Sequence, residues 1–186
     1  ICGSGIIEAI AEMFLVGVLS SDGVIKGELA AKSSRIVADG RTFSYLLHEG
    51  EPRIVVTQND VRAIQLAKGA LYAGARLLMD RLGIDDVDKI SLAGAFGSHI
   101  DVKYAMVLGL IPDCDLNKVA SVGNAAGTGA RIALLNHPSR TEIEEVVAGV
   151  EKVETATEPA FQQHFVDAMA FPHKTADYSH LEKVVV

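Results

Sequence analysis

The most informative stretch of the chain is ISLAGAFGSHID, from Ile90 to Asp101. It begins as an apolar strand, breaks at Gly94 and Gly97, and ends at Asp101, a residue type that favours the N-cap of a helix. The two glycines have two explanations: they allow a tight turn, or they let the backbone approach a ligand closely. In open α/β sheets, ligands bind beyond the carboxyl ends of the strands, where this turn would lie.

Two further stretches place a glycine turn at the start of a helix. Residues 119–135 pass from an apolar strand through Gly123 into a helix rich in small residues, and residues 2–5 (CGSG) open the first helix, with Ser4 as its expected N-cap. Three such turns favour a nucleotide site, although tight-turn geometry explains any one of them. No stretch matches the P-loop pattern, and the glycines after residue 119 do not form G-x-G-x-x-G.

Hydrophobic periodicity predicts an α/β architecture. Helices alternate with strands, which favours a largely parallel sheet. Three short β-rich runs at about residues 35–57, separated by turn residues, predict a small antiparallel meander. We expect a single domain over residues 1–186, with a polar tail from about residue 171. The expected helices are residues 6–19, 60–82, 101–108, 123–135, 141–148 and 160–169, and the expected strands outside the meander are residues 89–93, 119–122 and 151–157.

Composition argues against several functional classes. The 186 residues carry a net charge of −7 and no cluster of Lys and Arg, which argues against a nucleic-acid partner. The longest apolar run is too short and too charged to span a membrane. Cys2 and Cys114 are far apart, which excludes a disulfide framework and favours a cytoplasmic protein. Because the chain begins with Ile1 and not Met, we expect it to be a piece of a longer protein.

The long helix over residues 60–82 carries an unusual pair. Gln65 and Lys68 are three residues apart and share a face, and Lys68 interrupts an apolar stripe. Two interpretations stay open: a lysine that extends its charged end to solvent, or a cation and an amide that face a nucleotide. A Thr-x-x-Asp pattern at residues 57–60 predicts a capping box at the start of this helix, and the glycine after residue 82 predicts its end.

Four motifs, in their order along the chain, resemble one known family. They are ICGSGIIEAIAEM, TQNDVRAIQLAKGAL, ISLAGAFGSHID and SVGNAAGTGARIALL, and with the final FVDAMAFPH the resemblance covers nearly the whole chain. The chain is similar to the carboxy-terminal domain of the reductive activators of corrinoid proteins, which are ferredoxin-like ATPases of the actin, sugar kinase and heat-shock ATPase superfamily. The resemblance implies a ribonuclease-H-like half of that fold, with the antiparallel meander inserted.

The resemblance also implies an adenosine site. Residues 92–97 match the adenosine motif, Gln65 and Lys68 match the helix that flanks adenine and ribose, and residues 123–126 match the second connecting motif at the hinge. Residues 2–5 would follow the second phosphate loop. No catalytic or metal-binding residue is implied in this chain. The implied cofactor-binding residues are Gly3, Ser4, Gly5, Gln65, Lys68, Gly94, Ala95, Phe96, Gly97 and Asn124.

By the same resemblance, the intact protein uses ATP with Mg²⁺ to return the cob(II)alamin of a corrinoid protein or methyltransferase to cob(I)alamin. The electron would come from a 2Fe-2S domain that precedes this chain, and the family implies a homodimer. The phosphate loops would also lie before Ile1, so the chain alone would neither hydrolyse ATP nor carry an electron. Two alternatives stay open: a kinase-like phosphotransferase that acts on a small molecule, and a non-catalytic dimerisation or docking module of the same fold.

Overall fold

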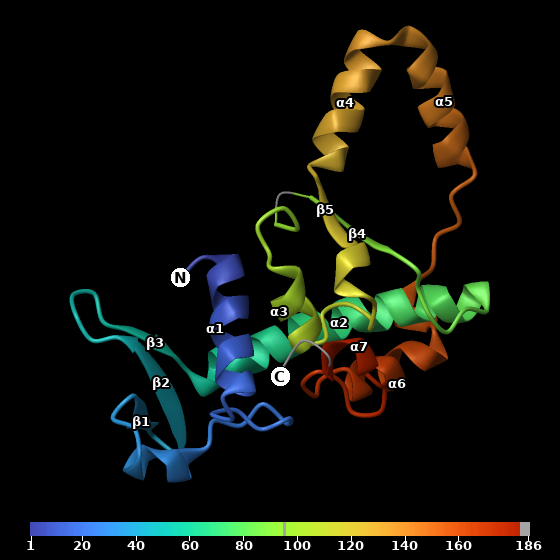
Figure 1. The fold of residues 1–186 in the computed structure, drawn as a ribbon. Coiled ribbons are helices and arrows are strands. Elements are labelled where there is room, and N and C mark those ends of the chain that lie inside the picture. The colour runs from blue at the N-terminus through green and yellow to red at the C-terminus, as the bar shows by residue number, and fades with distance from the viewer. Residues whose placement is uncertain (95, 183–186) are drawn as a thin grey trace.

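The fold is organised around one long helix, α2 (Gln58–Leu82). A computed structural model describes residues 1–94 and 96–182 (Figure 1). In Figure 1 a small antiparallel sheet and helix α1 (Gly3–Leu15) lie toward the first turns of α2. A parallel strand pair lies above the middle of α2, and a helical hairpin extends from this pair away from the rest of the chain.

Helix α1 starts earlier than its sequence predicts, because it includes the glycines of its first turn. Cys2 is extended and its sulfur accepts a hydrogen bond from the backbone N–H of Gly5, so the expectation that Ser4 caps the helix is wrong. Apolar residues at helical spacing hold the helix against the core. The buried ones are Ile7, Ile10, Ala11 and Met13.

The predicted antiparallel meander is confirmed. It consists of β1 (Ile36–Asp39), β2 (Thr42–His48) and β3 (Ile54–Val56), in the order β1-β2-β3. Gly40 forms the turn between the first two strands with a φ of +60°, a conformation that glycine adopts at no steric cost. One side of the sheet contributes Ile36 and Val56, which both pair with Tyr45, to the buried core of the domain.

Both predicted ends of α2 are confirmed. The Thr57 hydroxyl and the Asp60 carboxylate form a reciprocal capping box at its start, and Gly83 ends it in the left-handed conformation. Within the helix, a Cβ atom on Gly69 would lie 3.3 Å from the backbone oxygen of Phe165 in helix α6 (Pro159–Asp167). This glycine therefore allows two helices to pack closely.

The parallel part of the fold has two strands in the described chain, β4 (Ile90–Ala93) and β5 (Val119–Gly123). Helix α3 (Val102–Val107) follows the first strand, with Asp101 as its N-cap, and a 3₁₀ turn at Leu116–Lys118 precedes the second. The predicted parallel sheet outside the meander is therefore found, with two strands among the residues described.

The helical hairpin consists of α4 (Ala125–Leu135) and α5 (His137–Ala148), and neither helix contains a buried residue. The strand predicted over residues 151–157 is wrong. The segment is irregular and ends in a 3₁₀ turn at Thr155–Thr157. Its side chains are exposed except for the half-buried Val153. The alternating pattern therefore buries no face of the segment, and without burial it does not stabilise a strand.

The segment from residue 171 is part of the core, although its composition predicts a polar tail. Phe171, Tyr178 and Leu181 are buried, and the last of these lies in the short helix α7 (Ser179–Glu182). The Tyr178 hydroxyl donates a hydrogen bond of 3.0 Å to the carbonyl of Ile111. Among the described residues, no helix combines the length and apolarity that crossing a bilayer requires.

Candidate functional site

The two strand-to-helix glycine turns lie side by side. Strands β4 and β5 run parallel, and Ala93 is opposite Gly123 where both strands end. The backbone N–H of Gly94 donates a hydrogen bond of 2.8 Å to the carbonyl of Gly123. Turns that are about thirty residues apart in sequence therefore meet at one edge of the sheet, beyond the carboxyl ends of the strands, where α/β folds bind ligands.

The first turn of α1 joins the same surface. A Cβ atom on Gly3 would lie 2.9 Å from Cε2 of Phe96, so the aromatic ring rests on the glycine backbone. In Figure 1 the loop after β4 lies next to the first turn of α1. Phe96 remains 51% exposed. We use the term glycine-turn surface for residues 3–5, 94, 96, 97, 123 and 124.

The two glycines that follow β4 are needed for different reasons. Gly94 has a φ of +110°, which side chains rarely tolerate, and a Cβ atom there would meet no other atom within 4 Å. A Cβ atom on Gly97 would lie 3.3 Å from the carbonyl oxygen of Ala93. Gly94 therefore faces open space, whereas Gly97 closes a tight turn. Ala95, the predicted site residue between them, lies outside the described residues.

Asn124 caps helix α4 at the edge of this surface. Its Oδ1 accepts a hydrogen bond of 3.0 Å from the backbone N–H of Gly127. A Cβ atom on Gly127 would approach the Asn124 amide nitrogen to 2.9 Å, so the glycine leaves room for the cap. The cap accounts for Asn124 structurally, and its contact with a nucleotide stays a prediction.

The first turn of α1 also places an exposed thiol beside the surface. The sulfur of Cys2 lies 3.4 Å from the Ser4 hydroxyl and accepts a hydrogen bond from Gly5. These contacts lower the pKa of the Cys2 thiol, and the Ser4 hydroxyl is the largest cause. Cys114 is buried, and burial raises the pKa of its thiol. One exposed and one buried cysteine do not form a shared ligand set.

Gln65 lies inside the domain and not at the glycine-turn surface. It is 1% exposed. Its amide nitrogen donates to the carbonyls of Asp22 at 3.1 Å and Met169 at 2.7 Å, and its oxygen accepts a hydrogen bond of 2.6 Å from Arg62. Because these bonds use both ends of the amide, the prediction that Gln65 faces a nucleotide is wrong for this arrangement.

Lys68 is equally buried, at 1% exposed, and both interpretations drawn from the sequence fail for it. Its ammonium donates to the carbonyls of Ala170 at 2.5 Å and Pro172 at 2.7 Å, and it lies 5.3 Å from the centre of the Phe171 ring. Burial lowers the pKa of Lys68 to about 7. The charged end therefore reaches neither solvent nor the glycine-turn surface. We call residues 168–173, which these side chains hold, the C-terminal strap.

Comparison with known proteins identifies the family. Residues 1–182 match the family described as the C-terminal domain of RACo, the ASKHA domain. The chain belongs to this family. The corrinoid activation enzyme RamQ of Eubacterium limosum is 38% identical to this RACo-type ASKHA domain in an alignment of 177 residues that covers 89% of the chain and 30% of that protein.

A solved structure extends the comparison to the fold. It is named the reductive activator for corrinoid, iron-sulfur protein, and it superposes with a TM-score of 0.82 at 31% sequence identity, over 93% of this chain and 28% of that one. The predicted family and its actin-like fold are thus confirmed, including the inserted three-stranded antiparallel sheet. This RACo-type ASKHA domain spans less than a third of the length of each relative. It covers 30% of RamQ and 28% of the reductive activator of known structure.

The glycine-turn surface has features that suit the binding of a ligand: exposed backbone, an aromatic ring and the first turn of a helix. Across the described residues, no group of three or more His, Cys, Asp or Glu side chains is placed to hold a metal ion. The sequence showed each glycine turn separately. It gave no sign that Gln65 and Lys68 of α2 form hydrogen bonds to the C-terminal strap.

Proposed function

We propose that this RACo-type ASKHA domain is the adenosine-binding half of an ATP-dependent reductive activator, which returns the cob(II)alamin of a corrinoid protein to cob(I)alamin. The names of the two relatives support the corrinoid part of the proposal. The observation that carries the nucleotide part is the meeting of three glycine turns at one exposed surface.

The nucleoside would lie against the turn after β4. Gly94 leaves open space at the backbone, and the exposed Phe96 ring offers a flat apolar face for a base or a ribose. The same turn includes Gly97. The phosphates would point toward the first turn of α1, at Gly3, Ser4 and Gly5, because backbone N–H groups at a helix start favour anions. Asn124 borders the same space.

The contribution of this domain to the reaction is conformational. Nucleotide bound to one half of a two-part fold favours the conformation that binds it better, and this shift would change the geometry at the corrinoid. ATP would supply the binding energy, and the ligands of Mg²⁺ and of the γ-phosphate would come from outside this chain. Cys2 and Cys114 do not fit a 2Fe-2S cluster, so the electron would enter through another part of the protein.

The protein would act in the cytoplasm as a homodimer, on a corrinoid protein or methyltransferase. The exposed α4–α5 hairpin favours a second candidate function, in which the domain is a dimerisation or docking module. Neither helix is buried, and both carry large apolar side chains that are more than half exposed. These are Leu134, Leu135, Val146 and Val147. No observation favours the kinase-like alternative.

The test uses the full-length protein with its corrinoid partner and a strong reductant. Loss of cob(II)alamin is followed by visible absorbance, with and without ATP, for the parent protein and for Gly94→Val. Gly17→Val is the matched control, because Gly17 also has a positive φ, +76°, and also has nothing within 4 Å of a Cβ position. It lies just after α1 and outside the glycine-turn surface.

We expect ATP-dependent loss of cob(II)alamin that Gly94→Val abolishes and Gly17→Val retains, with both variants folded by circular dichroism. If Gly94→Val retains the full rate, the turn is plain geometry and the site proposal fails, while the activity stands. If no corrinoid partner shows ATP-dependent loss and partner binding is intact, the docking module replaces the activator as the function.

A further inference from the structure

The C-terminal strap ends in a turn that is built around one histidine side chain. Nδ1 of His173 accepts a hydrogen bond of 3.1 Å from the backbone N–H of Thr175 and one of 2.9 Å from the backbone N–H of Ala176. Because both partners are donors, Nδ1 carries no proton, and the ring is neutral with its proton on Nε2. The turn therefore requires one particular protonation state of His173.

The immediate contacts of this ring oppose a positive charge. Nε2 is buried and has no hydrogen-bond partner among the residues described. The centre of the ring lies 4.7 Å from the centre of the Tyr72 ring in α2. Burial is the largest cause that lowers the pKa of His173, and the charge of Lys68 lowers it further. A proton added to Nδ1 would also point at two N–H donors.

Charged groups act on the ring from two helices. Lys68 of α2 and His164 of α6 oppose its protonation, whereas Asp167 of α6 favours it. The Asp167 carboxylate also lies 3.9 Å from the ammonium of Lys174, the next residue along the strap. The titratable groups that act on the neighbouring Tyr72 are Arg76, Asp80, Asp113 and Tyr178. Two of the three charged groups that act on the ring therefore favour its neutral form.

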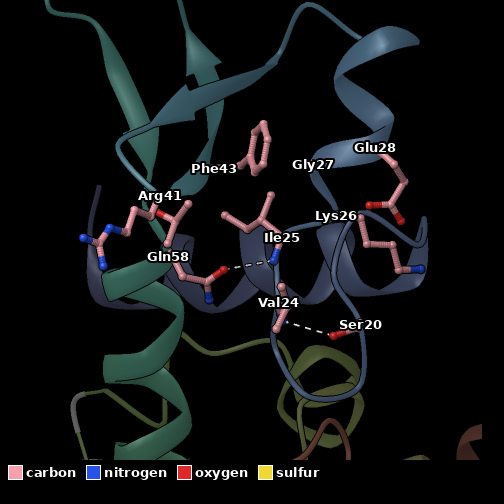
Figure 2. A pocket seen from close by; sticks show the side chains of 10 residues that line it. Ser20, Val24, Ile25, Lys26, Gly27, Glu28, Arg41, Phe43 and Gln58 are labelled. Atoms are coloured by element: carbon pink, nitrogen blue, oxygen red, sulfur yellow. Dashed lines mark hydrogen bonds between the residues drawn. The ribbon is translucent and has the colours of Figure 1, made fainter.

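The strap closes on a loop that hydrogen bonds hold in place. The N–H of Phe171 donates a bond of 2.8 Å to the carbonyl of Ser21, in the loop that follows α1. Figure 2 shows this loop where it lines a pocket, and Gln58, the first residue of α2, accepts a bond of 3.0 Å there from the N–H of Ile25. Because α2 fixes the loop, we expect the strap to be the part that opens.

We propose that His173 makes the C-terminal strap an acid-sensitive closure, in which protonation of the ring breaks the turn at residues 173–176 and releases the strap from α2. The strap is closed while Nδ1 accepts both backbone N–H groups, and acidification removes that acceptor. Opening exposes Gln65 and Lys68, the two α2 side chains that form hydrogen bonds to the strap. The strap is separate from the glycine-turn surface, so the proposal stands or falls independently of nucleotide binding.

The test is hydrogen exchange of the full-length protein without nucleotide, measured by mass spectrometry at pH 7.5 and pH 5.5. The amides to follow are those of Phe171, Lys174, Thr175 and Ala176, which are all hydrogen-bonded in the closed strap. Exchange is expressed as a protection factor, which corrects for the effect of pH on the intrinsic exchange rate.

The decisive variant is His173→Asn. An asparagine side-chain oxygen accepts backbone N–H groups two or three residues ahead, as Nδ1 does here, but it does not titrate. His173→Ala removes the acceptor altogether. His137→Asn is the matched control, at an exposed histidine in the α4–α5 hairpin. Lys68 is present in every variant, so its own titration is common to all of them.

We expect strap protection in the parent and in His137→Asn to fall about tenfold more between pH 7.5 and pH 5.5 than in His173→Asn. The reason is that an exposed histidine with a pKa of about 6.5 takes up a proton on opening in this range. His173→Ala should be weakly protected at both pH values. The nitrogen NMR spectrum of isotope-labelled histidine rings, assigned through the signal that His173→Asn lacks, should show Nδ1 unprotonated at pH 7.5.

Three results would overturn the proposal. The first is equal protection of the parent strap at both pH values. The second is a loss of protection in His173→Asn as large as in the parent. The third is a proton on Nδ1 of His173 at pH 7.5.

Discussion

Burial of Lys68 makes the stability of the domain depend on pH in a direction that can be measured. The ammonium is enclosed by the C-terminal strap, with the carbonyls of Ala170 and Pro172 as hydrogen-bond acceptors. No carboxylate within the described chain forms an ion pair with it. Removal from water is the cause that lowers the pKa of Lys68 from its ordinary 10.5 to about 7. The perturbation is Lys68→Met, which keeps the length of the side chain and removes the charge.

The sign follows from proton counting. Between pH 7 and pH 10 the unfolded chain holds more protons at this side chain than the folded chain does, so the free energy of unfolding rises with pH. Each pKa unit corresponds to about 1.4 kcal/mol, and integration over this window gives about 3–4 kcal/mol of added stability at pH 10. Lys68→Met lacks this gain. The variant also leaves two buried carbonyls without a donor, which costs about 1–3 kcal/mol each at every pH.

The assay is equilibrium urea unfolding of the 186-residue chain at pH 7, 8, 9 and 10. The quantity of interest is the unfolding free energy of the parent minus that of Lys68→Met, because this subtraction removes the titration of all other groups. We expect the difference to grow with pH by about 3–4 kcal/mol. Lys32→Met, at an exposed lysine, is the matched control. A constant difference for Lys68→Met would refute the reasoning.

Three further predictions concern stability and titration. Gly109→Ala should lose about 1–3 kcal/mol more unfolding free energy than Gly17→Ala, because both glycines have positive φ but only at Gly109 would a Cβ atom meet a carbonyl oxygen, at 2.0 Å. Thr57→Ala should lower the unfolding free energy by about 1 kcal/mol through loss of the capping box. Glu12 accepts a hydrogen bond from Tyr104 and raises the pKa of Tyr104 to about 12, so Glu12→Gln should lower that pKa in an NMR titration of the tyrosine ring carbons. Equal losses at the two glycines, an unchanged urea midpoint in the threonine variant, or an unchanged tyrosine titration would each contradict the corresponding prediction.

Local signals in the sequence predicted local structure well. The Thr57–Asp60 capping box, the left-handed Gly83 and the Asp39-Gly40 turn are each determined by neighbouring residues, and each is found where the sequence places it. The strand predicted over residues 151–157 failed because alternation alone does not provide a partner strand. Strand formation depends on neighbours that a pattern in one segment cannot specify.

The buried side of α2 shows the limit of periodicity. Leu71, Leu78 and Leu82 recur at helical spacing and would be placed in a core, yet each is more than half exposed. Gln65 and Lys68 occupy the buried side instead. They are tolerated there because carbonyls about a hundred residues away complete their hydrogen bonds, and single-sequence reasoning has no access to that pairing.

The candidate site was predictable in its parts but not in its assembly. The glycines at residues 3, 94 and 123 could each be marked from a local pattern. That they meet depends on the parallel pairing of β4 with β5 and on the contact between Gly3 and Phe96, both of which are tertiary. Family resemblance supplied the expectation of a shared site, because related sequences share such pairings even where local physics does not reveal them.

The C-terminal strap also constrains how this domain is made in the cell. The hydrogen bonds from α2 to the strap join residues 102 to 104 positions apart, and Phe14 of α1 packs 5.9 Å from the Phe171 ring. On the ribosome, α2 is therefore synthesised long before the strap carbonyls that accept hydrogen bonds from Gln65 and Lys68. A nascent chain that ends before residue 169 lacks both printed acceptors of the Lys68 ammonium and one acceptor of the Gln65 amide, so burial of this side of α2 costs more free energy until the strap has been synthesised.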